Sequence, residues 1–364
     1  MSNKIRLRKG LNIPLKGSAE THIAKNISPN IIAVKPTDFK GLNPKLLVKE
    51  GDLVKAGTPV IADKKRPEIL ICSPISGTVK EVVRGEKRKL LEILIESDKK
   101  HEYQQIVTPN FRKATQKELK ETLLAGGMWP MIKQRPYGII PSPSVEPKAI
   151  FISGFDTSPL APDLDFTLKA EFEHMQVGVE VLSKLTGGGV HLSLNADNFA
   201  GSPLHRLEKV SLHVFDGPHP AGNVGVQIHH IAPIRSGEKV WTMRVQDVIA
   251  LGKLFATGEV RRTAIVAITG NEVIEPQYVS TFPGASVAEL TQGNVTDGKL
   301  RYISGDVLSG KQVFATGFMN EKDDQLTVIE EGDFYEMFGW LMPLSPRPSA
   351  SGTYPNGLFP NMKF

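Results

Sequence analysis

The sequence contains a single cysteine, Cys72, among its 364 residues. One cysteine cannot form a disulfide within the chain, and it cannot build an iron–sulfur cluster or a zinc ribbon held by cysteines alone. A reducing compartment fits this composition best. Cys72 lies between Ile71 and Ser73 in a predicted apolar strand with no histidine close in sequence, so we interpret it as a small buried hydrophobic residue and not as a nucleophile.

Long apolar runs are also absent. No stretch approaches the roughly 18 consecutive apolar residues that a membrane-spanning helix requires. The first ten residues are basic, but the apolar segment of a secretory signal does not follow them. These absences predict a cytoplasmic protein, or a peripheral protein on the cytoplasmic face of a membrane.

The common nucleotide-binding and hydrolase motifs are missing as well. There is no Walker A sequence and no nucleophile elbow. Three glycines at 187–189 follow a predicted helix and precede a predicted strand, which is the reverse of the order in a dinucleotide-binding turn. We interpret them as the end of a helix. The sequence therefore predicts no catalytic residue and no cofactor-binding residue.

The net charge of +5 is distributed unevenly along the chain. Residues 1–100 carry 21 Lys and Arg against 11 Asp and Glu, and the remaining residues carry 23 against 28. Basic turns lie at 64–66 and 84–89, without the interleaved aromatic residues that a platform for single-stranded nucleic acid needs. Nucleic acid is therefore not an expected partner, whereas anionic headgroups or acidic protein loops are.

The length predicts two or three domains. Residues 28–97 alternate apolar and polar positions between turn glycines, which indicates a small β-barrel or sandwich. A helix is predicted over 116–125, because Thr115 and Glu118 have the spacing of a capping box and Gly126 follows the last turn.

From residue 148 the pattern changes to strands that alternate with helices. An apolar stripe from Leu168 to Leu182 has helical spacing, and a second helix is predicted over 243–256. This alternation indicates an α/β layer with parallel pairing. After Gly258 the elements shorten into a small α+β unit, in which Ser286 and Glu289 are predicted to cap a short helix. An aromatic run over 334–340 resembles the start of another helix.

The most unusual local sequence is the histidine- and glycine-rich stretch over 212–230. Several imidazoles in one loop are a possible zinc site, but no cysteine or acidic residue stands at a ligand spacing. We favour a hydrogen-bonded, glycine-rich loop and predict no metal site.

Residues 48–83 resemble a biotinyl- or lipoyl-type barrel-sandwich domain, in Val48-Lys-Glu-Gly-Asp-Leu-Val-Lys-Ala-Gly-Thr-Pro and Ser73-Pro-Ile-Ser-Gly-Thr-Val. In carrier domains, a modified lysine lies on the hairpin between these two pieces. Lys64 and Lys65 occupy that hairpin here, but the usual sequence around a modified lysine is missing and Pro67 intrudes. A carrier protein remains an alternative.

Nearly the whole chain resembles the NqrA family, a subunit family of the bacterial Na⁺-translocating NADH:quinone reductase. The resemblance rests on Lys9-Gly-Leu-Asn-Ile-Pro-Leu-Lys-Gly17, on the barrel-sandwich and on Asp216-Gly-Pro-His-Pro-Ala-Gly-Asn-Val-Gly-Val-Gln-Ile-His229. It implies a multidomain α/β and β fold. The implied layout is a barrel-sandwich hybrid over 1–100, a Rossmann-like domain over 101–258, a β-grasp, soluble-ligand-binding domain over 259–330, and the start of a truncated helical region over 331–364.

This family is similar in layout to the C subunit of the Rnf complex and to the flavin subunit of complex I. This sequence lacks the cysteine clusters of the Rnf C subunit and the glycine-rich flavin loop of the complex I subunit. The resemblance therefore implies a subunit without cofactors, with flavins and an iron–sulfur centre on other subunits. An Rnf-type electron-transport subunit is the second alternative.

The resemblance further implies a peripheral subunit on the cytoplasmic side of the inner membrane, which docks onto membrane subunits and contributes to quinone reduction coupled to sodium export. If quinone contacts this chain, we expect it in the glycine-rich loop, where backbone approach is close and an imidazole can hydrogen-bond a quinone carbonyl. The candidate residues are His219, Pro220, Gly222, Gly225 and His229.

Overall fold

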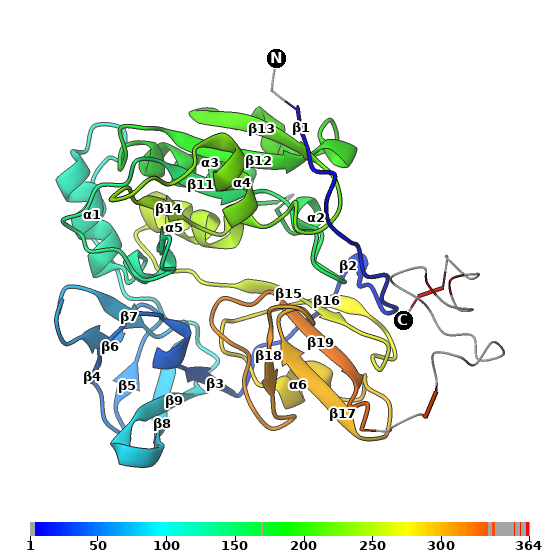
Figure 1. Ribbon diagram of the computed structural model, residues 1–364. Helices are drawn as coiled ribbons and strands as arrows, with labels where there is room; N and C mark the ends of the chain where they lie inside the picture. The colour runs from blue at the N-terminus through cyan, green and yellow to red at the C-terminus, as the bar shows by residue number, and fades with distance from the viewer. Residues whose placement is uncertain are drawn as a thin grey trace.

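The computed structural model describes residues 4–168 and 170–333, together with residues 337, 338, 353, 357, 362 and 363. The chain builds three units: an α/β domain, a barrel-sandwich and a C-terminal β-rich domain (Figure 1). The helix predicted over 334–340 and most of the region 331–364 lie outside the described residues. Within the described part, no helix has both the length and the apolar character needed to cross a membrane.

The barrel-sandwich is made of two small antiparallel sheets that enclose isoleucine-rich apolar residues such as Ile61, Ile71 and Ile93. Cys72 is 6% exposed, and burial raises the pKa of its thiol to about 12. Its strands are β3 (Ile31–Val34), β9 (Leu90–Ser97), β8 (Gly77–Arg84) and β5 (Leu53–Val54) in one sheet, and β4 (Pro44–Leu46), β6 (Pro59–Asp63) and β7 (Leu70–Cys72) in the other.

The α/β domain has a six-stranded sheet in the order β1-β13-β12-β11-β14-β10. All neighbouring pairs are parallel except β10 with β14. Its strands are β1 (Lys4–Arg6), β10 (Lys133–Arg135), β11 (Ile150–Ser153), β12 (Val190–Asn195), β13 (Val210–Asp216) and β14 (Val240–Thr242).

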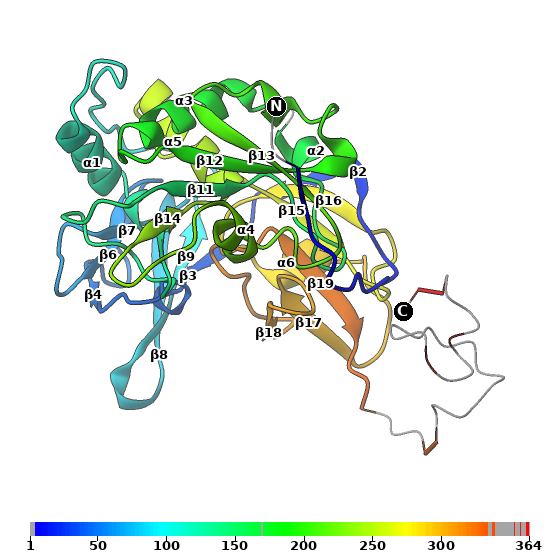
Figure 2. The ribbon, with the colours of Figure 1, turned by 45° about the horizontal axis from the view of Figure 1, so that its top comes forward.

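Helices cover both faces of this sheet (Figure 2). Ile150 and Ile152 belong to the same apolar cluster as α3 (Phe172–Ser183) and α5 (Val245–Thr257), whereas Phe151 packs with α4 (Val224–Ile231). Because successive side chains of a strand point to opposite faces, α4 lies opposite the pair formed by α3 and α5.

Two glycines allow α3 and α5 to approach closely. A Cβ added to Gly252 would lie 1.8 Å from the carbonyl oxygen of His174, and one added to Gly178 would lie 2.3 Å from that of Val248. Only a residue without a Cβ fits at either contact. The packing of α3 on α5 therefore depends on both glycines.

Local sequence signals located some of the helices correctly. α1 spans Gln116–Ala125, and its capping box forms as predicted, with Glu118 Oε2 accepting from the Thr115 amide at 2.8 Å. The predicted apolar stripe is divided between α2 (Leu164–Leu168) and α3, so Leu168 belongs to a separate short helix.

The C-terminal domain is a mixed sheet in the order β18-β17-β19-β15-β16-β2. The capping box predicted for α6 (Val287–Thr291) is wrong: Ser286 makes no side-chain cap bond, and the Glu289 carboxylate accepts from the amide of Asn30 at 2.9 and 3.1 Å. A contact with the barrel-sandwich thus replaces a local one. The strands are β15 (Ala264–Thr269), β16 (Gln277–Thr281), β17 (Leu300–Ser304), β18 (Lys311–Val313) and β19 (Gln325–Glu330).

The N-terminal segment joins two of these units. β1 pairs in parallel with β13 of the α/β domain, and β2 (Glu20–Asn26) pairs in parallel with β16 of the C-terminal domain. Residues 4–26, which were predicted to belong to the barrel-sandwich, therefore supply an edge strand to each of the other two sheets (Figure 1). The predicted multidomain α/β and β fold class is otherwise confirmed.

Candidate functional site

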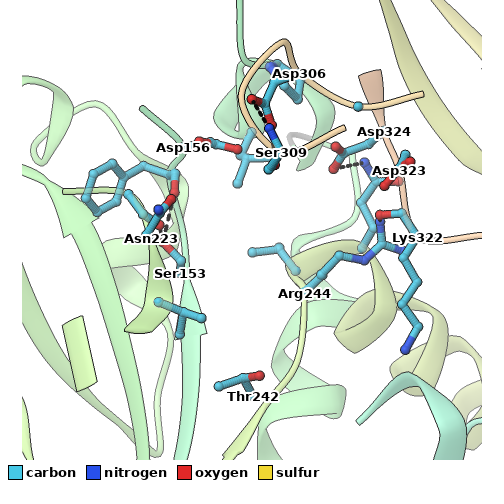
Figure 3. A pocket seen from close by; sticks show the side chains of 18 of the residues that line it. Ser153, Asp156, Asn223, Thr242, Arg244, Asp306, Ser309, Lys322, Asp323 and Asp324 are labelled. Atoms are coloured by element: carbon cyan, nitrogen blue, oxygen red, sulfur yellow. Dashed lines mark hydrogen bonds between the residues drawn. The ribbon is translucent and has the colours of Figure 1, made fainter. Parts of the chain in front are cut away.

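A cavity of about 580 Å³ opens between the α/β domain and the C-terminal domain. On one side, its wall is formed by the segments after β11 and β14 and by the first turn of α4. On the other side, it is formed by residues of two loops of the C-terminal domain, within 305–310 and 322–325 (Figure 3).

The strand order explains why a cavity forms here. β11 lies between β12 and β14 in the sheet. The chain leaves β11 toward β12 on one side, and the strand on the other side, β14, continues into α5, so the connections after β11 and β14 run to opposite sides. In open parallel sheets, the crevice at the carboxyl ends of the strands beside such a point is the usual ligand-binding position. The cavity occupies that position.

The prediction of a glycine-rich loop over 212–230 is wrong in its second half, because residues 224–231 form helix α4. The sequence does contain a signal for this helix, since Val224, Ile228 and Ile231 have helical spacing and Asn223 is a residue type that favours an N-cap. The chain therefore runs from strand β13 through a glycine-rich turn into a helix. That order is the one found in a dinucleotide-binding turn.

The glycines of this turn are packed against protein backbone. A Cβ added to Gly222 would lie 2.6 Å from the amide nitrogen of Thr157, and one added to Gly217 would lie 2.4 Å from the carbonyl oxygen of Leu7. The N-terminal segment also donates from the Leu11 amide to the carbonyl oxygen of His219 at 3.0 Å. Neighbouring segments thus pack directly against these two glycines, whose lack of a Cβ is used for contact with protein backbone.

Hydrogen bonds of His219 hold the turn in place. Its Nδ1 lies 3.1 Å from Thr157 Oγ1, and its amide donates to Asn12 Oδ1 at 2.8 Å. Thr157 Oγ1 also accepts from the amide of Gly222 at 2.9 Å. The Ser153 hydroxyl interacts with the Gly222 carbonyl oxygen at 3.0 Å, which ties the turn to the end of β11. His219 therefore has a positioning role in this structure.

The five candidate residues do not form one cluster. Gly222 and Gly225 line the cavity, whereas His219, Pro220 and His229 do not. Gly225 and His229 are both exposed and lie one turn apart on α4. The structure therefore divides the predicted loop into a turn that is buried at Gly222 and an exposed helical face.

Charged residues that sequence analysis did not select form much of the cavity wall. Arg244 binds Asp247 through Nε and Nη2 at 2.9 and 3.0 Å. Burial raises the pKa of Asp324 to about 6, against the opposing charge of Arg244. Lys133 and Arg135, on β10, also line the cavity. No local motif marks these residues, because segments far apart in the sequence bring them together.

The hairpin of the predicted carrier lysines is held against the protein body. Arg66 binds the buried carboxylate of Asp63 at 2.8 Å and donates to the carbonyl oxygen of Ile140 at 3.2 Å. Lys64 and Lys65 themselves are exposed. The base of this hairpin is therefore anchored while its two lysines face solvent.

Two histidines of neighbouring strands, His191 and His213, are in contact. His191 Nδ1 lies 3.0 Å from His213 Nε2, and burial followed by the charge of His213 lowers the pKa of His191 to about 4. Within 4–168 and 170–333, no three histidine, cysteine or acidic side chains are grouped so that they could hold a metal ion.

Comparison with known proteins gives consistent matches over the three units. Family models described as the NqrA N-terminal barrel-sandwich hybrid domain, the NqrA second alpha/beta domain and the NQRA C-terminal domain match residues 5–98, 114–260 and 265–315. The NqrA subunit of the Na(+)-translocating NADH-quinone reductase of Yersinia pestis is 38% identical over 344 residues, which are 93% of this chain and 76% of the relative.

The corresponding subunit of Neisseria meningitidis serogroup C is 36% identical over 354 residues, covering 96% of this chain and 78% of the relative. Among solved structures, an air-oxidized NAD⁺-reducing NiFe hydrogenase matches with a TM-score of 0.36 and 14% identity, over 51% of this chain and 41% of that one. A similarity this low carries no structural argument.

Proposed function

Because this chain belongs to the NqrA family of the Na⁺-translocating NADH-quinone reductase, we propose that it docks onto the membrane subunits of that complex on the cytoplasmic side. It is a peripheral subunit of an oxidoreductase complex, and it contributes to quinone reduction without carrying a redox centre. The observation that carries this proposal is the identity of 36–38% to named NqrA subunits over more than nine-tenths of the chain.

The packing of the β13–α4 turn supports a subunit without its own flavin or nicotinamide cofactor. Gly217 and Gly222 lie against the backbone of Leu7 and Thr157, whereas the corresponding glycines of a dinucleotide-binding turn let the backbone approach the pyrophosphate. The flavins and the iron–sulfur centre then belong to other subunits. A visible absorption spectrum of the purified chain tests this, because a bound flavin would colour the protein yellow and the proposal predicts a colourless one.

The hairpin between β8 and β9 is the proposed docking element. It projects from the barrel-sandwich (Figure 2), and its tip carries the exposed residues Lys87, Arg88 and Lys89. Their side chains have no ion-pair or hydrogen-bond partner among the residues that the structure describes. An acidic surface of a membrane protein in the complex, or anionic lipid, would supply the missing partners.

Charge reversal at this tip tests the docking role. The triple variant Lys87→Glu, Arg88→Glu and Lys89→Glu is expected to weaken assembly of the complex, most strongly at low salt where screening is least. Reversal of three exposed lysines outside the barrel-sandwich, Lys113, Lys117 and Lys239, is the matched control. If the triple variant assembles like the unmodified chain at low salt, the tip is only a solvated surface.

We propose further that quinone approaches the α4 face that carries Gly225 and His229. A Cβ added to Gly225 would meet no atom within 4 Å, so this face is open, and the exposed His229 imidazole can donate to a quinone carbonyl. A photoreactive quinone analogue is expected to label residues 217–230 in the assembled complex.

His229→Ala should reduce this labelling. His22→Ala is the matched control, because it removes an exposed imidazole on β2, outside the proposed quinone contact. Labelling that falls entirely outside 217–230 would contradict the proposed quinone contact.

A further inference from the structure

The interdomain cavity contains charged groups of both signs, and most of them already have partners. On the acidic side, the carboxylate of Asp306 accepts from Ser309 Oγ at 2.6 Å, and that of Asp323 accepts from Ser304 Oγ at 2.7 Å. Asp156 accepts from the Ser158 hydroxyl at 2.6 Å. These carboxylates are therefore satisfied by neighbouring residues and add little demand for a bound cation.

Two of the basic groups are satisfied as well. Arg244 is bound by Asp247 on the first turn of α5. Lys322 Nζ donates to the carbonyl oxygen of Pro130 at 2.7 Å, and Figure 3 shows its side chain directed away from the centre of the cavity. Neither side chain requires a ligand.

Lys133 and Arg135 differ from Arg244 and Lys322 because their charged groups have no partner in the described part of the chain. Both line the cavity from alternate positions of β10, so they project from the same face of that strand. Within the described part of the chain, neither Lys133 Nζ nor the Arg135 guanidinium has a hydrogen bond or an ion pair, and Arg135 Nε is buried without a partner. Among the basic residues that line the cavity, Lys133 and Arg135 are thus two whose side chains have no hydrogen-bond or ion-pair partner among the described residues.

Other basic side chains and two helix N-termini lie near Lys133 and Arg135. Burial, followed by the charges of Arg244 and Arg135, lowers the pKa of Lys133, against Asp247 and Asp323. The first turns of α4 and α5 both line the cavity, and neither helix has a side-chain cap on its N-terminal amides. Uncapped helix N-termini favour an anion, and a partly buried cation without a partner is costly.

We propose that this cavity binds a small organic phosphate of nucleoside-monophosphate size, with the phosphate held by Lys133 and Arg135. An Arg guanidinium beside a Lys ammonium is a suitable pair for a phosphate, and the cavity volume of about 580 Å³ falls in the range of small-molecule sites. Asp324 also lines the cavity, and its carboxylate can accept from ribose-type hydroxyls. The cavity borders the β13–α4 turn at Gly222, but the proposed phosphate ligands Lys133 and Arg135 lie on β10, and binding requires no redox chemistry.

Calorimetric titration of the full chain with AMP, adenosine and inorganic phosphate tests the proposal. AMP is expected to bind with one site per chain, and adenosine at least tenfold more weakly because it lacks the phosphate. Lys133→Gln and Arg135→Gln should each weaken AMP binding roughly tenfold or more, because each substitution removes a charge-assisted hydrogen bond to the phosphate. Arg135→Lys keeps the charge and should recover part of the loss.

The matched control is Lys45→Gln, which removes an exposed cation on β4 of the barrel-sandwich and should leave AMP affinity within about twofold. Circular dichroism and thermal unfolding of each variant verify that it is folded. The proposal is overturned if AMP does not bind at millimolar concentration, or if neither Lys133→Gln nor Arg135→Gln changes its affinity. Equal affinity for AMP and inorganic phosphate would contradict the nucleoside component.

Discussion

A buried ion-pair network at the junction of the three units leads to the most specific stability prediction. Arg262, in the connection between α5 and β15, binds the Glu321 carboxylate through Nη1, and its Nη2 lies 3.9 Å from Asp247 Oδ1. The Glu321 amide donates to Asp38 Oδ2 of the barrel-sandwich at 2.8 Å. Arg262 is 6% exposed and Glu321 4%. The network therefore joins all three units, and the Arg262 and Glu321 side chains within it are almost fully shielded from solvent.

Glu321→Gln removes the charge and keeps the shape of the side chain. Removal of one charge of a buried ion pair lowers the free energy of unfolding by roughly 3–5 kcal/mol, because the other charge remains buried without compensation. Asp247 still compensates Arg262 in part, so we expect the lower end of that range. At about 2–4 °C per kcal/mol for domains of 150–250 residues, the unfolding midpoint should fall by about 6–12 °C.

The assay is thermal unfolding of the full chain, followed by circular dichroism, for a double-mutant cycle of Glu321→Gln and Arg262→Met. The double variant should recover much of the loss, because it no longer buries an unpaired charge. Glu96→Gln is the control, since it breaks the Lys80–Glu96 pair whose side chains are 47% and 56% exposed, and it should cost less than about 1 kcal/mol. A Glu321→Gln midpoint equal to that of Glu96→Gln would refute the reasoning.

Three further predictions concern single positions. Thr115→Ala should destabilise α1 by about 1 kcal/mol through loss of its N-cap, seen as faster amide exchange in that helix. Gly252→Ala should lower the unfolding midpoint sharply, because a Cβ there would lie 1.8 Å from a carbonyl oxygen of α3. Gly187→Ala is the control and should change the midpoint little, because a Cβ there would have no atom within 4 Å. Equal shifts of the midpoint would contradict the packing of α3 on α5 through Gly252. Burial raises the pKa of Asp324 to about 6, so its contribution to stability should fall as pH rises from about 4 to about 6, and Asp324→Asn should remove that slope in unfolding curves.

The sequence predicted features that depend on neighbouring residues. The capping box of α1 is an example, because Thr115 and Glu118 satisfy each other's backbone amides within one turn. The family resemblance is another, and the comparisons confirm it together with the fold class and the role as part of a reductase complex. Both rest on patterns that are visible without knowledge of distant contacts.

Features that depend on pairing between distant segments were not predicted. β1 and β2 are edge strands that form through their pairing with the distant strands β13 and β16, so the N-terminal segment gave no sign that it joins two domains. Lys133 and Arg135 reach the cavity because β10 pairs with β14. Glu289 has the spacing of a capping residue, yet it binds Asn30 of the barrel-sandwich. Helix α4 was missed because Gly225 and the two prolines before it weigh against a helix, although its apolar spacing is helical.

The alternative functions differ from the proposed one in simple observables. A carrier protein predicts a mass increase on Lys64 or Lys65, which intact-mass spectrometry of the purified chain would detect. An Rnf-type electron carrier predicts a visible chromophore on this chain. The proposed cofactor-free subunit predicts an unmodified mass and a colourless protein.

Affinity purification of the tagged chain from native membranes in mild detergent tests the central claim most directly. We expect recovery of a flavin-containing complex of several subunits, with the flavin absorbance carried by proteins other than this chain. Recovery of this chain alone as a monomer, under conditions in which the membrane subunits remain intact, would contradict the claim.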